Sequence, residues 1–188
     1  MTATREQLLH LLLETGSFKY SDTPTFQLAS GAMSRFYVDC RVGLSHAPLR
    51  RIVGELMLAE AAGQAVDAAG GLLIGAYPIA IAVSDAAYAA GRTVRAFAVR
   101  KEPKSHGLKK LLEGDVKAGD RVLVVDDVIT SGKSTIEAIQ KCREAGLTVV
   151  KAVVMIDRQE QNGRKSIEAE GVPVGALCTL DDLQRIAV

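Results

Sequence analysis

Residues 121–135 read RVLVVDDVITSGKST, and this stretch decides how the chain folds. Its first part, residues 121–125, is a continuous apolar run with the length of a buried strand. Two adjacent carboxylates, Asp126 and Asp127, follow the run; a turn rich in hydroxyls and glycine comes next, and then helical spacing over residues 133–145. A strand that leads through a glycine turn into a helix is typical of βαβ units and predicts a parallel sheet.

The rest of the chain alternates between strand and helix patterns. Apolar runs predict further strands over residues 70–75, 93–99, 147–156 and 173–177. Helical spacing predicts helices over residues 47–62, 78–90 and 166–170, and a last one that begins at Asp181. This alternation predicts an α/β fold with a mainly parallel central sheet flanked by helices.

The N-terminal part has a different character. Five leucines predict an amphipathic helix over Arg5–Glu14, which Gly16 ends. Residues 18–40 place Phe, Tyr, Thr and Val between Ser, Gly, Asp and Pro, a composition typical of short strands and turns. We therefore expect a small N-terminal hood over residues 1–45 and an α/β core over residues 46–188, within one compact domain.

The composition excludes several classes of protein. Of the 188 residues, 48% are hydrophobic and 24% are charged, which excludes a disordered chain. The net charge of +1 gives no reason to expect binding of nucleic acid through bulk charge. The 3 cysteines form no C-x-x-C pair, which fits a reducing compartment and predicts neither a zinc site nor a disulfide framework. Because no stretch resembles a signal peptide or a membrane span, we expect a cytoplasmic protein without membrane contact.

The turn after the acid pair, Asp126 and Asp127, is the main candidate for a ligand site. A helix N-terminus offers free backbone N–H groups and the positive end of the helix dipole, so the turn predicts an anion site. A P-loop needs a glycine where Asp127 stands, and a dinucleotide-binding module needs G-x-G-x-x-G, so neither applies. A single aspartate after a strand usually caps a helix. Two in series beside a phosphate site suit a ribose 5-phosphate, whose 2- and 3-hydroxyls would donate to them.

The segment VLVVDDVITSGKST resembles the phosphoribosyl-pyrophosphate (PRPP) signature of type I phosphoribosyltransferases. The resemblance implies the fold of that family and transfer of phosphoribose from Mg²⁺–PRPP to a nucleobase. It also implies that Mg²⁺ is held mainly by PRPP and water, without protein ligands. The implied PRPP-binding residues are Asp126, Asp127, Val128, Ile129, Thr130, Ser131, Gly132, Lys133 and Ser134.

A basic segment, residues 100–110 (RKEPKSHGLKK), follows the strand predicted over residues 93–99. Most charged runs are solvated loops, but loops at the carboxyl ends of parallel strands face the ligand crevice, which favours a functional interpretation. The segment resembles the R-K-E-x-K-x-H-G catalytic loop of orotate phosphoribosyltransferases. That resemblance implies catalytic roles at pyrophosphate for Arg100, Lys101, Lys104 and His106. It also implies a homodimer, because in that family the loop reaches into the active site of the partner subunit.

Two further segments resemble elements of the same enzymes. Residues 26–39 (FQLASGAMSRFYVD) resemble the element that covers the base, which implies contacts to orotate from Phe36 and Tyr37. Residues 156–160 (IDRQE) resemble the D-R-Q-E element, in which Arg158 is the implied partner of the orotate carboxylate, with Thr130 as a further contact. Ala29 and Gly75 stand where some members of the family carry lysine, so no lysine contacts are expected there.

The resemblance implies transfer of phosphoribose from PRPP to orotate, giving orotidine 5-phosphate and pyrophosphate on the route to UMP. Two alternatives stay open. A phosphoribosyltransferase for another nucleobase, such as a purine, would share the PRPP signature. A PRPP-sensing regulator without catalysis would keep the fold, but the N-terminal helix has no helix-turn-helix partner and the basic segment is intact, which favours the enzyme.

Overall fold

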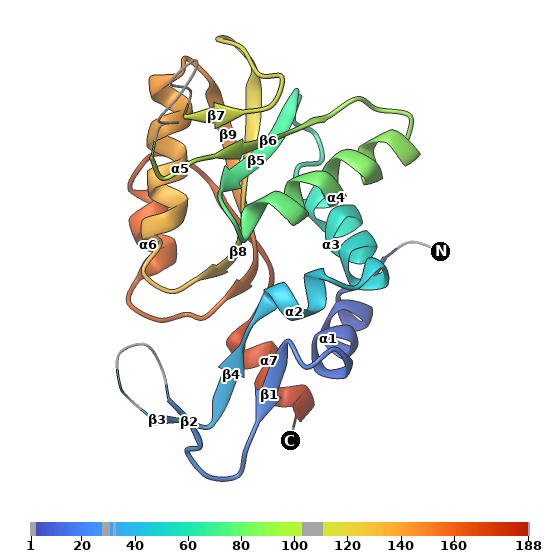
Figure 1. The fold of residues 1–188 in the computed structure, drawn as a ribbon, viewed down its shortest axis with the longest axis vertical. Helices are drawn as coiled ribbons and strands as arrows, with labels where there is room; N and C mark the ends of the chain where they lie inside the picture. Colours follow the sequence, from blue (N-terminus) through green and yellow to red (C-terminus); the bar gives the residue numbers. More distant parts are fainter. Residues whose placement is uncertain (1–2, 28–30, 32, 103–110, 188) are drawn as a thin grey trace.

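The structure is a computed structural model that describes residues 3–27, 31, 33–102 and 111–187. Its centre is a six-stranded sheet in the order β10-β9-β8-β5-β6-β7 (Figure 1). The parallel strands are β5 (Ala68–Leu72), β6 (Arg95–Val99), β8 (Arg121–Ile129), β9 (Thr148–Asp157) and β10 (Val174–Thr179). At one edge β7 (Leu112–Glu113) pairs antiparallel with β6. The prediction of a mainly parallel α/β sheet is confirmed.

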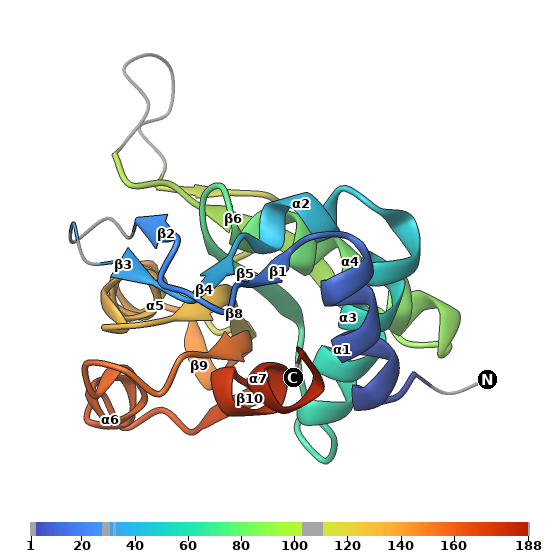
Figure 2. The ribbon, with the colours of Figure 1, turned by 90° about the horizontal axis from the view of Figure 1, so that it is seen from below.

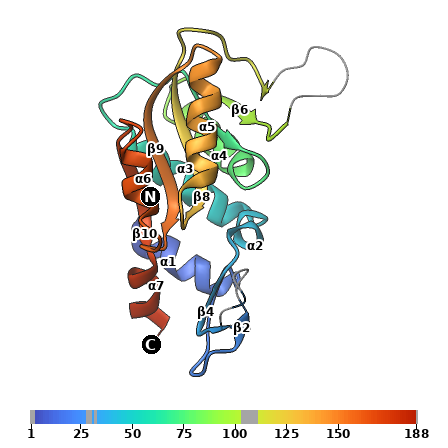
Figure 3. The same ribbon diagram turned by 90° about the vertical axis from the view of Figure 1, so that its left-hand side faces the viewer.

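Helices cover both faces of this sheet (Figures 1 and 3). One face carries α3 (Ala47–Glu60) and α4 (Ala76–Ala89), and the other carries α5 (Lys133–Glu144) and α6 (Gly163–Glu168). Leu123 and Val125 belong to the core on the α3 and α4 side, whereas Val124 belongs to the core on the α5 side. Neighbours on β8 therefore point to opposite faces, as side chains along a strand do.

The hood lies at one end of the sheet (Figures 1 and 2). It consists of α1 (Arg5–Glu14), the antiparallel pair β1 (Phe18–Tyr20) and β4 (Phe36–Val38), and the antiparallel pair β2 (Phe26–Gln27) and β3 (Met33–Ser34). The C-terminal helix α7 (Leu180–Ala187) packs against α1, β1 and β10. Leu8 and Phe18 of the hood share one apolar cluster with Leu49 of α3, so hood and core are packed together.

Several local features differ from the sequence-based predictions; among them, α6 covers Gly163–Glu168 and not residues 166–170. The strand β8 continues through the acid pair to Ile129, because its ladder with β9 still pairs Val128 with Ile156. A helix of five residues, α2 (Cys40–Leu44), was not predicted; the Asp39 side chain caps it by accepting from the Arg41 N–H. The last helix begins at Leu180 and not at Asp181. The Thr179 hydroxyl accepts from the Asp182 N–H there, and the Asp182 carboxylate accepts from the Thr179 N–H.

Candidate active site

The two carboxylates of the acid pair point to opposite faces of β8. Asp126 faces α5, where its Oδ2 accepts from Ser134 Oγ and from Thr135 Oγ1, each at 2.8 Å. Its Oδ1 accepts from the Asp127 N–H at 3.0 Å, and the residue is only 5% exposed. Burial, followed by repulsion from the Asp127 charge, raises the pKa of Asp126 to about 6. Asp126 is thus tied to the first turn of α5.

Asp127 faces the opposite side and lines a cavity of about 270 Å³ that we call the acidic cavity; Asp126 also lines this cavity. A Cβ atom on Gly75 would stand 2.8 Å from Asp127 Oδ2, so glycine at that position leaves room for the carboxylate. Asp39 and Arg41 also line the cavity, with Arg41 Nε 2.9 Å from Asp39 Oδ1. The hydrogen bond from Arg41 lowers the pKa of Asp39. Sequence reasoning missed both residues, because the short helix α2 has no periodic pattern.

A second cavity of about 350 Å³, the turn cavity, adjoins the first. It is lined by the phosphate turn, which we define as Thr130, Ser131, Gly132, Lys133 and Ser134. Leu72, Lys101, Val128 and Ser134 line both cavities. Gly132 caps α5 with a φ of +79°, and a Cβ atom there would lie 2.8 Å from the Gly163 carbonyl oxygen. The turn therefore needs glycine, both for its left-handed backbone and for its contact with α6.

The structure places two of the predicted catalytic residues at this site or next to it. Lys101 lines both cavities, and the neighbouring Arg100 has its Nη1 3.6 Å from Glu113 Oε1. Lys104 and His106 lie outside the described residues. Within the described ranges, no group of three or more His, Cys, Asp or Glu side chains is arranged to hold a metal ion, and no helix is long and apolar enough to cross a membrane.

The residues predicted to contact orotate lie in two parts of the fold. Thr130 and Arg158 follow the neighbouring strands β8 and β9, where the Arg158 N–H donates to the Ile129 carbonyl oxygen at 3.0 Å, whereas Phe36 and Tyr37 lie in the hood. Thr130 lines the turn cavity. Arg158 follows β9 and is 15% exposed; its Nη2 lies 3.1 Å from Glu160 Oε1, while its buried Nε has no partner among the described residues. Phe36 packs against Tyr20 inside the hood, with ring centres 5.4 Å apart. Tyr37 lies on the other side of β4, where its ring stacks on Phe26. Neither cavity includes Arg158, Phe36 or Tyr37 in the described part of the chain.

Comparisons with known proteins agree with this geometry. The phosphoribosyl transferase domain family matches residues 54–174. The orotate phosphoribosyltransferase of Aquifex aeolicus is 40% identical over 179 residues, which covers 95% of this chain and 97% of that protein. The crystal structure of the Mycobacterium tuberculosis orotate phosphoribosyltransferase in complex with Fe(III) dicitrate has 35% identity and a TM-score of 0.84, covering 95% of this chain and 98% of that one.

A second crystal structure of the Mycobacterium tuberculosis enzyme, in complex with PRPP, has 32% identity and a TM-score of 0.80, covering 96% of this chain and 98% of that one. The likeness therefore extends over hood and core together, and it includes the elements that form both cavities. The family expected from the PRPP signature is confirmed. The chain belongs to the orotate phosphoribosyltransferase family.

Proposed function

We propose that the protein transfers the phosphoribosyl group of PRPP to orotate, forming orotidine 5-phosphate and pyrophosphate on the route to UMP. The observation that carries the proposal is the pair of adjoining cavities at the carboxyl end of β8. One contains a hydroxyl-rich turn at a helix N-terminus, the other contains Asp126 and Asp127, and Lys101 lines both. A 5-phosphate in the turn directs the ribose diol toward Asp127, and the names of the relatives support orotate as the base.

The PRPP-binding roles differ from residue to residue in this proposal. The Ser134 hydroxyl has one proton, which it donates to Asp126, so Ser134 serves the phosphate through its backbone N–H. The hydroxyls of Thr130 and Ser131 make no hydrogen bond within the described part of the chain and can donate to the 5-phosphate. Asp127 accepts from the ribose hydroxyls, and Asp126 holds the first turn of α5 in place behind it.

Catalysis consists mainly of positioning and charge balance. The bond from the anomeric carbon to pyrophosphate breaks through a transition state with oxocarbenium character, and negative charge grows on the leaving group. At about 4 Å one ammonium contributes roughly 4 kcal/mol of attraction at intermediate dielectric, and the part that grows toward the transition state accelerates the step. We assign this role to Lys101, with Arg100, Lys104 and His106 as further members by resemblance.

The resemblance implies that Mg²⁺ would be bound together with PRPP and held mainly by substrate oxygens and water. The carboxylates of Asp127 and Asp39 line the acidic cavity and are hard oxygen donors, which fits contact with this ion or its water shell. When bound, the ion neutralises charge on the pyrophosphate. We also propose a cytoplasmic location, which suits the buried free thiols of Cys40, Cys142 and Cys178.

The first test is the fall in orotate absorbance on addition of PRPP and Mg²⁺. Arg158→Ala is expected to raise KM for orotate about tenfold or more, because a charge-assisted hydrogen bond to the base carboxylate is lost. In Arg158→Ala, KM for PRPP is expected to stay near the wild-type value. The control is Arg121→Ala at the far end of β8, in which KM for orotate and KM for PRPP both stay near their wild-type values. A change confined to PRPP affinity would remove Arg158 from the orotate site.

The same assay separates the alternatives. Turnover of adenine or hypoxanthine in place of orotate would identify a purine enzyme. Binding of PRPP without turnover of any base would identify a sensor.

We propose in addition that the protein is a homodimer that meets its partner along α4. Four exposed apolar side chains, Ile74, Tyr77, Ile81 and Tyr88, are 71%, 40%, 40% and 84% exposed. The spacing of four and seven residues places Tyr77, Ile81 and Tyr88 on one face of α4, and Ile74 lies in the turn that precedes the helix. Ile74 also lines the acidic cavity, so a second copy on this stripe would lie next to the active site.

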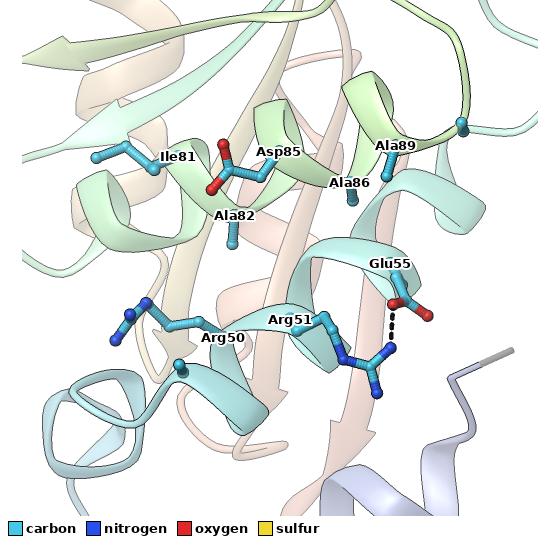
Figure 4. Close-up of a pocket in the computed structure, with 10 residues that line it drawn as sticks. Arg50, Arg51, Glu55, Ile81, Ala82, Asp85, Ala86 and Ala89 are labelled. Carbon is cyan, nitrogen blue, oxygen red and sulfur yellow. Dashed lines mark hydrogen bonds and ion pairs between the residues drawn. The ribbon is translucent and has the colours of Figure 1, made fainter. Parts of the chain in front are cut away.

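A hollow of about 460 Å³ between α3 and α4 continues this surface (Figure 4). Its floor includes Ala82 and Ala86, and its rim carries Arg50 from α3 and Asp85 from α4. Because a two-fold interface uses the same patch on both subunits, one copy can offer the arginine where the other offers the aspartate. Both the apolar stripe and the opposite charges thus suit a second copy of the chain.

Ile81→Glu is expected to convert the protein to a monomer in sedimentation analysis, because it places a charge in the apolar stripe. Activity falls with dissociation if the basic segment is shared between subunits. The control is Glu144→Lys, an exposed charge change on α5, which leaves the dimer intact. A wild-type protein that sediments as a monomer at assay concentrations would disprove the shared site.

A further inference from the structure

The side chain of Lys141 reaches from α5 to the start of the basic segment. Its Nζ donates to the carbonyl oxygens of Arg100 at 2.9 Å and Lys101 at 2.6 Å, and to Glu137 Oε1 at 2.6 Å. An ammonium has three N–H groups, so these bonds use all of them. The side chain is only 14% exposed, and its position is therefore fixed by these contacts.

The two carbonyl groups belong to the point where the chain leaves the sheet. β6 ends at Val99, and the Arg100 N–H still donates to the Leu111 carbonyl oxygen at 2.8 Å. The carbonyls of Arg100 and Lys101 then turn toward α5, where Lys141 is their donor. The helix that forms the phosphate turn at its N-terminus thus also holds the backbone of Lys101, the cation that lines both cavities.

We infer that Lys141 is a positioning residue for catalysis, which fixes the start of the basic segment so that Lys101 stays at a set distance from the bound PRPP. The inference rests on the proposed role of Lys101. Coulomb attraction falls with distance, and a displacement of about 1 Å at a catalytic group can cost about 100-fold in rate. Glu137 strengthens the arrangement, because it lines the turn cavity and pairs with Lys141 one helical turn away.

Lys141→Met keeps an unbranched side chain that is one atom shorter and removes its donors. We expect kcat to fall about 10-fold to 100-fold, with KM for orotate unchanged within about twofold. Lys141→Arg, which retains charge and donors, recovers most of the rate. The matched control is Arg143→Met on the same helix, because Arg143 bonds only to Glu170 in the described part of the chain, and this variant keeps the wild-type kcat.

Two further measurements separate positioning from general stabilisation. In a Lys101→Ala background, Lys141→Met is expected to lower kcat no further, because it acts through Lys101. Hydrogen exchange at the Arg100 amide is expected to be faster in Lys141→Met and unchanged in Arg143→Met. Equal kcat values for the two single variants, or a full additional loss in the Lys101→Ala background, would overturn the inference.

The exchange measurement needs no substrate. If the wild-type protein does not consume orotate, the proposed function fails, and the exchange rate at Arg100 still decides whether Lys141 holds this backbone. Unchanged exchange in Lys141→Met would overturn the inference whatever the activity.

Discussion

Gly132→Ala is expected to lower kcat/KM for PRPP by about 100-fold, since small displacements of a substrate-positioning group have effects of that size. The glycine has a φ of +79°, and an added Cβ would lie 2.8 Å from the Gly163 carbonyl oxygen and 3.1 Å from Ile167 Cγ1. The first contact is with backbone, which cannot move aside cheaply. The turn must shift instead, and its backbone N–H groups then no longer point toward the 5-phosphate. Calorimetric titration with PRPP and steady-state kinetics measure the loss.

Gly119→Ala is the matched control for this variant. Gly119 has a φ of +91°, but nothing lies within 4 Å of its added Cβ. Gly119→Ala therefore has the strain of a left-handed backbone, about 1 to 2 kcal/mol, without a close contact at the added Cβ atom. Ser131→Ala removes one hydroxyl from the turn without strain and is expected to weaken PRPP binding about tenfold. If Gly132→Ala and Ser131→Ala both bind PRPP as the wild type does, the turn does not bind the phosphate.

The elements with strong periodicity could be predicted from the sequence, and those held by distant contacts could not. The predicted helix over residues 133–145 is α5, and the predicted helix Arg5–Glu14 is α1 with the same bounds. Both have enough apolar residues at helical spacing to be recognised in the sequence. α2 has only five residues, and its cap depends on one hydrogen bond, which the Asp39 side chain accepts from the Arg41 N–H. Such a helix gives no periodic signal.

In the candidate site, too, local sequence features could be predicted and distant contacts could not. The phosphate turn could be found because its residues are consecutive. The hydrogen bond from the Lys141 side chain to the Lys101 carbonyl oxygen joins residues 40 positions apart in the sequence, and no local pattern predicts it. The sequence predicts Asp126 and Asp127 as equivalent partners of a diol at the end of a strand, whereas β8 continues through them to Ile129 and turns their carboxylates to opposite faces. Both residues line the acidic cavity, but Asp126 also accepts from Ser134 and Thr135, so we expect different tasks for the two carboxylates.

Asp127→Asn is expected to lower kcat/KM for PRPP by about 10-fold to 100-fold, because a charged acceptor for the ribose hydroxyls is lost. Its melting temperature changes little, since the side chain is only half-buried. Asp126→Asn also weakens PRPP binding, by loosening the first turn of α5, but its main effect is on stability. Kinetics and thermal melting of both variants measure the difference.

The stability effect of Asp126 depends on pH with a sign that the structure fixes. The folded state raises the pKa of this carboxyl from 3.8 to about 6, so folding favours the protonated form. Its contribution to the free energy of unfolding is complete below about pH 4 and is lost as the pH rises through about 6. Asn cannot titrate, so the stability of Asp126→Asn relative to wild type rises between those values, as urea denaturation at a series of pH values would show. Asp127→Asn serves as the comparison: it keeps the buried carboxyl and removes the repulsion from the Asp127 charge, so we expect a pH dependence of the same sign as in wild type and of smaller size. If the free energies of unfolding of Asp126→Asn and wild type differ by a constant amount across this range, Asp126 is not a buried acid with a raised pKa. The different tasks proposed for the two carboxylates would then lose their basis.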